Sequence, residues 1–463
     1  MKAAFYTLGC KVNQYETETI REKFRQRGYE IVSEDDPADV YVVNTCTVTN
    51  MADRKSRQFI RKAHKLNPDA VIAVTGCYAQ MDKEAVASIE GVDIVTGTDE
   101  KSRIFELVQE ALEGNHNLIN VKQYDQLNKY EELGLISEME GRTRAFIKIQ
   151  EGCDRFCSYC IIPFARGKVR SRARDEIVSE VSSLVRRGYK EIVLTGINTA
   201  LYGTDFGYGG IAPLIESLDE MPSDFRIRLS SLEPTVVDAD YAVGLLKYDR
   251  LCHHLHLSAQ SGSDHVLAAM NRHYTHDDYL SIVRRLREQD PYYGISADII
   301  VGFPGETEED FEDSVRLVRE AELVKTHVFK YSVRRGTRAA GMADQIDEKI
   351  KNRRSKILIA EAEEVQRKFL EKCRGTVRRV LLEREEDGML TGYTDIYIKV
   401  YVPAGEIERA ATKAGGFDID RMSSHALADG SEADGTRAEI GGFADVRLGE
   451  LYEDGMSGEI TDL

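Results

Sequence analysis

The chain lacks any apolar run long enough to cross a membrane. Although 42% of its 463 residues are hydrophobic, the longest apolar runs, such as 70–74 and 299–302, have only the length of strands. A membrane helix needs about 20 apolar residues. The first residues, 1–6, also lack the apolar core and the cleavage site of a signal peptide. We therefore expect a cytoplasmic protein that has no membrane partner.

The chain also lacks an excess of positive charge and any internal repeat. Its formal net charge is -17, which argues against a nucleic-acid partner unless a local basic segment overrides the total. No repeat of about 20–50 residues is found, which argues against a solenoid. At roughly 100–200 residues per domain, the length predicts two to four domains.

Residues 1–113 alternate short apolar strands with helices. Continuous apolar strands separated by helices are typical of a parallel sheet that is covered on both faces. The pattern therefore predicts an N-terminal parallel-sheet α/β domain, followed by a polar linker over residues 114–141. Strands are expected at 3–7, 39–43, 71–74 and 93–95.

The alternation resumes over residues 142–372 and ends in a long charged helix, 347–372. Six strand–helix units are too few for an eightfold barrel and predict a partial one. Residues 373–463 predict a small C-terminal β-barrel, with an insertion at about 405–442, so the fold class is α/β overall. The six central strands are expected at 145–149, 191–194, 226–229, 254–257, 296–301 and 326–331.

Cysteine is sparse, but three of the eight cysteines stand in one loop. Cys153, Cys157 and Cys160 have the spacing C-x3-C-x2-C. Disulfides are not expected in a reducing compartment, so metal binding or catalysis is the better interpretation. Three soft thiolates suit a four-iron cluster that keeps one iron open. A zinc site with a distant fourth ligand is the alternative, although no common zinc spacing occurs.

Three further cysteines stand at predicted strand ends. Cys10, Cys46 and Cys77 each follow a strand of the N-terminal sheet, and ligands of such sheets bind at the carboxyl ends of strands. Gly9 and Gly76 precede two of them and permit tight turns. The sequence therefore predicts a second, shared metal site. Buried structural thiols are the alternative.

The cysteine loop resembles the signature of the radical S-adenosylmethionine (SAM) superfamily, in which an aromatic residue, here Tyr159, precedes the last cysteine. The resemblance implies that the open iron of a [4Fe–4S] cluster binds SAM, and that the reduced cluster cleaves SAM to a 5′-deoxyadenosyl radical. With its N-terminal cysteines and C-terminal β-barrel, nearly the whole chain resembles the radical-SAM methylthiotransferases. Four stretches match that family: 160–167, 228–234, 256–263 and 301–307.

The family resemblance implies a division of labour between two [4Fe–4S] clusters. The loop cysteines would hold the cluster that generates the radical, and the N-terminal cysteines would hold a cluster that carries the sulfur to be transferred. The C-terminal barrel resembles the TRAM domain, which helps to bind RNA, although acidic residues outnumber basic ones after residue 374. The implied partners are tRNA, a sulfur donor and an electron donor such as flavodoxin or ferredoxin.

The resemblance also implies a set of SAM contacts at strand ends. Tyr159 would face the adenine, and Thr195 with Gly196 would lie beside the amino group. The alternative for each of these residues is an ordinary cap or turn. The set is Tyr159, Thr195, Gly196, Ser231, Glu233 and Gln260.

A basic segment follows the cysteine loop. Its basic residues alternate with small or apolar ones, so in an extended strand all of them would point to the same side. Arginine binds phosphate through paired N–H donors, so we expect an RNA-binding face here. A solvated face without a ligand is the alternative. The residues are Arg166, Lys168, Arg170, Arg172 and Arg174.

The motif around the first cysteine separates the branches of the family. Lys11 and Val12 resemble the branch that acts on N6-threonylcarbamoyladenosine (t6A) at tRNA position 37. The isopentenyladenosine branch usually has Met where Val12 stands, and the ribosomal-protein branch usually has Pro where Lys11 stands. The resemblance implies that a methylthio group is added to carbon 2 of t6A. Those two other substrates, and a zinc-stabilised RNA-binding module without catalysis, are the alternatives.

Two smaller groups of residues complete the candidates. His254 and His256 share one face of a predicted strand and could indicate a metal ion, but the family resemblance accounts for this stretch without one. Cys252 and Cys373 stand outside both cysteine sets and are expected to be structural thiols.

Overall fold

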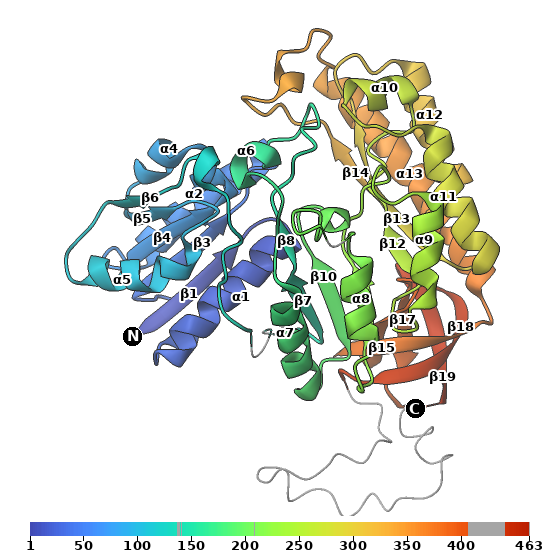
Figure 1. The fold of residues 1–463 in the computed structure, drawn as a ribbon, viewed down its shortest axis with the longest axis horizontal. Coiled ribbons are helices and arrows are strands. Elements are labelled where there is room, and N and C mark those ends of the chain that lie inside the picture. The colour runs from blue at the N-terminus through green and yellow to red at the C-terminus, as the bar shows by residue number, and fades with distance from the viewer. Residues whose placement is uncertain (137–138, 140, 208, 406–439, 463) are drawn as a thin grey trace, which may run out of the picture.

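The computed structural model describes residues 1–136, 139, 141–207, 209–405 and 440–462. An N-terminal α/β domain lies beside a central barrel-like domain, and a small β-barrel lies below (Figure 1). This confirms the predicted α/β fold class with its three parts. Most of the expected insertion at 405–442 lies outside the described residues. No helix of the described chain is long and apolar enough to span a bilayer.

The N-terminal sheet consists of β1 (Lys2–Thr7), β2 (Glu30–Val32), β3 (Val40–Thr45), β4 (Val71–Gly76), β5 (Val92–Thr96) and β6 (Leu118–Asn120). All six strands are parallel, in the order β2-β1-β3-β4-β5-β6. Four were predicted, while the short edge strands β2 and β6 were not. The segment expected to be a linker thus contributes β6 to this sheet.

Helices cover both faces of the N-terminal sheet because both faces are apolar. The longest, α1 and α2, follow the first and second cysteine of the N-terminal set. The helices are α1 (Lys11–Gln26), α2 (Asn50–Leu66), α3 (Cys77–Met81), α4 (Lys83–Ala87) and α5 (Ile104–Leu112).

The central domain contains the six predicted parallel strands: β7 (Arg144–Lys148), β10 (Glu191–Thr195), β11 (Arg226–Leu229), β12 (His254–His256), β13 (Gly294–Val301) and β14 (Lys325–Lys330). They form two three-stranded sheets, β7-β10-β11 and β12-β13-β14. An isolated bridge between Ile227 and Leu251 and another between Leu232 and Leu257 connect the two sheets. Two short strands, β8 (Gln150–Glu151) and β9 (Arg170–Ser171), pair separately.

One continuous apolar core fills the space between these strands and the helices outside them. Polar side chains of the strands pair with one another, Glu191 with Arg228 and His256 with Asp298. The helices are α6 (Ile162–Arg166), α7 (Arg174–Arg186), α8 (Ala212–Asp219), α9 (Ala239–Gly244), α10 (Asp264–Ala269), α11 (His276–Gln289) and α12 (Glu308–Glu320). The 3-10 turns of the chain are η1 (Lys101–Arg103), η2 (Tyr124–Gln126), η3 (Thr199–Leu201), η4 (Leu245–Lys247) and η5 (Arg338–Gly341).

The N-terminal domain lies along the open side of the barrel, between its outer strands β7 and β14. On one edge, α1 packs against β7. On the other edge, the backbone N–H of Asn50 donates to the hydroxyl of Ser332, just after β14, at 3.4 Å. Arg334 pairs with Asp53 at 2.7 Å nearby. The N-terminal domain therefore contacts both edges of the opening.

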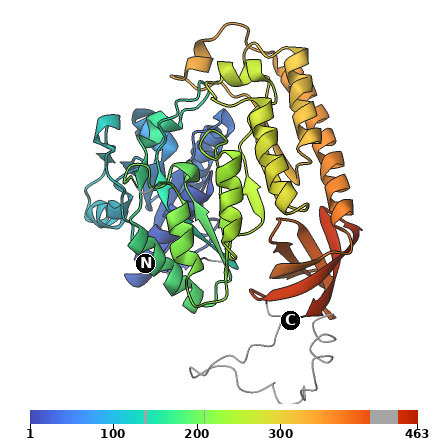
Figure 2. The same cartoon turned by 45° about the vertical axis from the view of Figure 1, so that its right-hand side comes forward.

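The C-terminal barrel is closed, in the order β15-β16-β17-β19-β18. The predicted long helix, α13 (Glu348–Cys373), leads down into it (Figure 2). Four antiparallel pairings and one parallel pairing, between β17 and β19, close the barrel around a small apolar core. The strands are β15 (Val377–Glu386), β16 (Met389–Thr394), β17 (Lys399–Pro403), β18 (Phe443–Tyr452) and β19 (Gly455–Asp462).

A turn between β16 and β17, residues 395–398, closes the lower end of the central barrel. Tyr397 adopts a positive φ of 70° and stacks on His254, with ring centroids 4.7 Å apart. A Cβ atom on Gly294 would lie 2.3 Å from the carbonyl oxygen of Ile396, so only glycine permits this approach. The C-terminal barrel is therefore anchored at the end of the central strands opposite to the cysteine loop.

Candidate active site

The cysteine loop lies just beyond the short strand β8. Burial, together with the neighbouring Cys157, raises the pKa of Cys153 and of Cys160 to about 12. Each of these thiols therefore lies close to the others in a site with little water. Metal ions bind thiolates, so a bound metal would displace these protons.

The second cysteine set meets at one edge of the N-terminal sheet, as predicted. Cys10, Cys46 and Cys77 follow β1, β3 and β4, which are neighbours in the sheet. Burial, together with the neighbouring Cys77 and Cys10, raises the pKa of Cys46 to about 12. Gly9 has a φ of 109°, and a Cβ atom there would lie 2.9 Å from the Cβ of Cys46. Glycine thus lets the first turn approach the second cysteine.

The spacing of the thiols favours a cluster over a single ion. In tetrahedral zinc sites the Zn–S distance is about 2.3 Å, which brings the sulfurs to about 4 Å from one another. Among the described residues, three possible ligand atoms lie within 4.8 Å of one another only in the group His256, Asp298 and His327. Neither cysteine set is that tight. A four-iron cluster binds each thiolate to a different iron, so its ligands stand further apart.

A cavity of about 360 Å³ lies beside the cysteine loop. All three loop cysteines line it, and residues 48–49, which follow Cys46, contribute to its wall from the N-terminal domain. The cavity therefore borders the loop site and reaches the domain that carries the second cysteine set.

Four of the six predicted SAM contacts line this cavity, and two do not. Thr195 is buried behind the wall, with its hydroxyl 3.5 Å from that of Ser230. A Cβ atom on Gly196 would lie 2.9 Å from the side chain of Gln150. The next residues in the chain, 197–198, face the cavity instead. The four lining residues are Tyr159, Ser231, Glu233 and Gln260.

Three polar residues of the cavity wall that were not predicted contact Glu233. Asn198 donates to its carboxylate at 2.7 Å, Arg155 pairs with it at 3.2 Å, and Arg272 pairs with it at 3.3 Å. Arg272 also donates to the Sγ of Cys157 at 3.5 Å. Only Arg155 lies in the cysteine loop, where the motif could have drawn attention to it.

The structure corrects the expected basic face. The segment is not one extended strand, because α6 ends at Arg166 and α7 begins at Arg174. Arg166, Arg170 and Arg172 are buried, whereas Lys168 and Arg174 are exposed. Buried carboxylates pair with the three buried arginines. The prediction that all five would share one exposed face is therefore wrong.

Arg166 instead joins the second cysteine set to the central domain. Its Nε donates to the Sγ of Cys77 at 3.3 Å, and its Nη1 contacts Glu16 at 2.9 Å and Glu151 at 2.6 Å. Burial alone would raise the pKa of Glu16, but Arg166, Lys101 and Lys148 hold it well below its usual range. A guanidinium beside a thiol favours the thiolate that a metal needs.

Known proteins match the chain over both cysteine-bearing domains. Residues 2–97 match the uncharacterized protein family UPF0004, and residues 147–318 match the radical SAM superfamily. The chain is 44% identical to the threonylcarbamoyladenosine tRNA methylthiotransferase MtaB of Bacillus subtilis, over 86% of this chain and 89% of that protein. It is 39% identical to the protein of the same name from Aquifex aeolicus, over 88% and 99%.

Other relatives are more distant. The tRNA-2-methylthio-N(6)-dimethylallyladenosine synthase of Clostridium tetani is 35% identical, over 85% of this chain and 89% of that protein. Among solved structures, the radical SAM methyltransferase TsrM of Kitasatospora setae superposes with a TM-score of 0.54 at 16% identity, over 84% of this chain and 81% of that one, and shares the fold. These matches over most of the chain show that it belongs to the radical-SAM methylthiotransferase family, in the branch of the MtaB proteins.

Proposed function

We propose that the protein adds a methylthio group to carbon 2 of t6A at position 37 of tRNA. The observation that carries the proposal is the pair of cysteine sites, one on each of two domains that share the wall of a single cavity. The substrate assignment is supported by the relative from Bacillus subtilis, which is named for threonylcarbamoyladenosine and is 44% identical. The dimethylallyladenosine synthase of Clostridium tetani reaches 35%.

SAM and [4Fe–4S] clusters are the cofactors of this family. We assign the SAM-binding cluster to Cys153, Cys157 and Cys160, whose loop lines the cavity. We assign the second cluster to the three cysteines at the ends of β1, β3 and β4. When bound, the first cluster supplies the electron that cleaves SAM and so provides a radical for an unreactive C–H bond.

The wall residues would position SAM. Arg155, Asn198 and Arg272 converge on Glu233 and fix the orientation of its carboxylate, which would accept hydrogen bonds from SAM. Gln260 holds a left-handed backbone conformation, with a φ of 63°, at the cavity wall. Such strain is often retained where a side chain must be held in place.

The aromatic rings near the cavity are better suited to bind an unpaired RNA loop than the basic segment is. Phe329 lines the cavity and is 48% exposed. Phe156 and Phe164, beside the cysteine loop, are exposed and meet edge to face at 5.7 Å. Exposed rings stack on bases of single-stranded RNA. We expect Lys168 and Arg174, the exposed members of the basic segment, to contact phosphate.

The proposed reaction consumes sulfur and electrons. A sulfur donor would therefore serve the second cluster, and a donor such as flavodoxin or ferredoxin would reduce the first. Because the substrate is tRNA, we expect the protein to work in the cytoplasm.

Iron, sulfide and product analysis of two triple variants tests the proposal. After anaerobic reconstitution, the wild type should hold about eight irons, and either triple alanine variant about four. Replacing the loop cysteines should abolish both 5′-deoxyadenosine and methylthio product. Replacing Cys10, Cys46 and Cys77 should leave 5′-deoxyadenosine formation and abolish the tRNA product. Cys252→Ala, which removes a buried thiol outside both sites, is the matched control.

Three results would contradict the proposal. Zinc without iron in the wild type would favour a zinc-stabilised RNA-binding module. A methylthio product on isopentenyladenosine tRNA, with none on t6A tRNA, would change the substrate. A product from the variant that lacks Cys10, Cys46 and Cys77 would refute the role of the second cysteine set.

A further inference from the structure

The helix α2, which begins beside the cavity, has the opposite charge to the chain as a whole. Thr49 caps the start of α2, and both Thr49 and Val48 line the cavity. Six of the 17 residues of α2 are lysine or arginine, whereas one, Asp53, is acidic. The whole chain instead carries 79 acidic and 62 basic side chains. The N-terminal domain therefore has a local basic segment directly beside the cavity.

One side of α2 is buried, and the other side is exposed. Phe59, Ile60 and Ala63 pack into the core of the N-terminal domain. The exposed residues recur at steps of three and four, so they share one side of the helix. At 1.5 Å per residue, α2 is about 25 Å long. Five exposed residues are basic and form what we call the α2 basic face: Arg54, Lys55, Arg61, Lys62 and Lys65.

The α2 basic face has little negative charge to neutralise it. Lys62 pairs with Asp35, but the other four side chains make no ion pair and no hydrogen bond with the described residues of the chain. Asp53, the acidic residue of α2, is buried and pairs with Arg334 at 2.7 Å. Like charges at helical spacing repel one another and destabilise a helix. A partner that carries negative charge would offset this repulsion.

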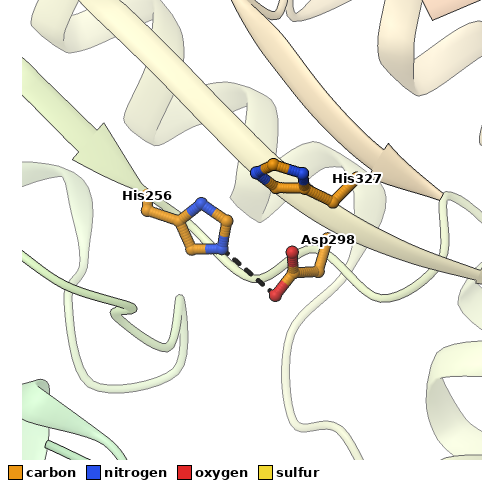
Figure 3. A group of neighbouring side chains, drawn as sticks. All are labelled: His256, Asp298 and His327. Atoms are coloured by element: carbon orange, nitrogen blue, oxygen red, sulfur yellow. Dashed lines mark ion pairs between the residues drawn. The ribbon is translucent and has the colours of Figure 1, made fainter. Parts of the chain in front are cut away.

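The basic side chains inside the cavity are paired instead. Arg155 and Arg272 both pair with Glu233, at 3.2 Å and 3.3 Å. On the central strands, His256 pairs with Asp298 at 3.1 Å (Figure 3). The carboxylate partners of these groups would repel a phosphate. The α2 basic face is therefore better suited than the cavity wall to contact an RNA backbone.

Exposed apolar side chains lie where α2 meets the cavity. Val48 and Phe329 line the cavity and are 51% and 48% exposed. Met51, in the first turn of α2, is also exposed. Aromatic and apolar surfaces bind unpaired bases, whereas lysine and arginine bind phosphates. Together these residues suit a nucleic acid in which an unpaired loop adjoins a stem.

We propose that the α2 basic face binds the phosphates of the tRNA stem next to the anticodon loop, while the target base enters the cavity. This inference rests on the proposed tRNA function and names the surface that holds the rest of the substrate. A helix about 25 Å long can contact several phosphates, because they are closely spaced along a duplex. An acidic electron-donor protein could also bind cations, but it offers no unpaired bases to the apolar side chains.

Binding of t6A tRNA to the holoprotein at several salt concentrations tests this surface. The α2 variant carries Arg54→Gln, Lys55→Gln and Arg61→Gln. The slope of log affinity against log salt concentration should become shallower by about two to three, because each lost phosphate contact releases about one counterion fewer. At low salt, the affinity should fall about 10- to 100-fold.

A matched variant on α13 controls for the loss of charge alone. Lys349→Gln, Lys356→Gln and Lys368→Gln remove three exposed charges on the other side of the molecule from α2 (Figure 1). This variant should keep the wild-type slope. Iron content and urea unfolding show whether both variants are folded and loaded. If the α2 variant loses iron, Lys55→Gln alone decides, with an expected change in slope of about one.

The outcomes separate the surface from the proposed function. If the wild type binds and modifies t6A tRNA while the α2 variant keeps the wild-type slope, the surface is wrong and the function stands. If the wild type neither binds nor modifies tRNA, the function fails as well. If the α2 variant keeps the tRNA slope but binds reduced flavodoxin more weakly than the wild type does, the face binds an electron donor and this inference is overturned.

Discussion

The central barrel buries arginine at both of its domain interfaces, but in different chemical settings. Toward the N-terminal domain, Arg166 donates to the thiol of Cys77. Toward the C-terminal barrel, Arg228 contacts Glu191 and donates to the carbonyl oxygens of residues 394–395, at 2.9 Å each. The first interface therefore couples domain packing to a candidate metal ligand, whereas the second satisfies buried backbone groups.

The balance of buried charge differs in the same way. At the N-terminal interface, two carboxylates face four basic groups, and the surplus positive charge lies beside the second cysteine set. Thiolates bound to a metal carry negative charge, which this surplus offsets. The groups are Glu16, Glu151, Lys101, Lys148, Arg166 and Arg170. We infer that the N-terminal interface serves the chemistry and the C-terminal interface serves stability.

Substitution of Arg166 and of Arg228 should give the largest difference between the two interfaces. Arg166→Met leaves two buried carboxylates with one cation fewer, so we expect a loss of about 3–5 kcal/mol in the free energy of unfolding. It should also reduce the iron content from about eight to about four per chain. Arg228→Met should destabilise the protein as well, but leave the iron content unchanged. Urea unfolding and iron analysis measure the two effects.

A surface arginine provides the control for both variants. Arg367 on α13 is half exposed and pairs with Glu364 and Glu371 along the same helix. Arg367→Met should leave the free energy of unfolding nearly unchanged, because solvent screens its ion pairs. Full iron content in Arg166→Met, or iron loss in Arg228→Met, would contradict the distinction between the interfaces.

The contribution of the C-terminal interface to the free energy of unfolding should decrease at acid pH. Burial alone would raise the pKa of Glu191, but Arg228, Arg226 and Arg144 hold it below its usual range. Its contribution to stability is therefore complete above the unfolded pKa of about 4.3 and is lost as the pH falls toward the folded value. Glu191→Gln should cost about 2–3 kcal/mol at pH 7. The difference from the wild type should shrink below about pH 4.

Urea unfolding of both proteins at several pH values measures this dependence. Iron content should be the same in Glu191→Gln and in the wild type, since Glu191 pairs with Arg226 and Arg228 and contacts no cysteine of either set. A difference in stability that stays constant down to pH 3 would show that the charge of Glu191 contributes little.

The same contrast explains what the sequence could predict. Cys153, Cys157 and Cys160 stand within eight residues of one another, so their spacing alone indicates a site. Cys10, Cys46 and Cys77 are far apart, but each follows an apolar strand, and the parallel sheet brings equivalent strand ends together. Local motifs and the topology of strands were therefore enough for the cysteines and the fold class.

Contacts that depend on tertiary packing were not predictable. Arg272 reaches Cys157 and Glu233 from a distant part of the chain, and no local pattern marks it. The alternation around Arg166 imitates a strand, yet the segment starts as a helix, α6, with a proline in its first turn. Residues 395–398 form a turn, although β-branched and aromatic residues around them are typical of one continuous strand. The chain turns there because Tyr397 adopts a positive φ, which is rare outside glycine and asparagine.

The smallest predicted effect lies at the edge of the C-terminal interface. The Nδ1 of His253 lies 2.7 Å from Asp290, which in turn is 4.0 Å from Arg378 of the C-terminal barrel. The hydrogen bond to Asp290 raises the pKa of His253, although burial opposes the shift. A raised pKa means that the pair stabilises the fold below the unfolded value of about 6.5 and loses this effect as the pH rises through the folded value.

His253→Gln should therefore lower the free energy of unfolding by about 0.2–1 kcal/mol at pH 5.5 and should not change it measurably at pH 9. The effect is small because the His253 side chain is 40% exposed and solvent screens the pair. Asp290→Asn should show the same direction, since it removes the partner. Neither variant should alter the iron content or the modification of t6A RNA, because we expect this interface to contribute only to the stability of the fold. A pH-independent loss in His253→Gln would instead assign the effect to packing against Tyr293, whose ring stacks on His253 at 5.6 Å.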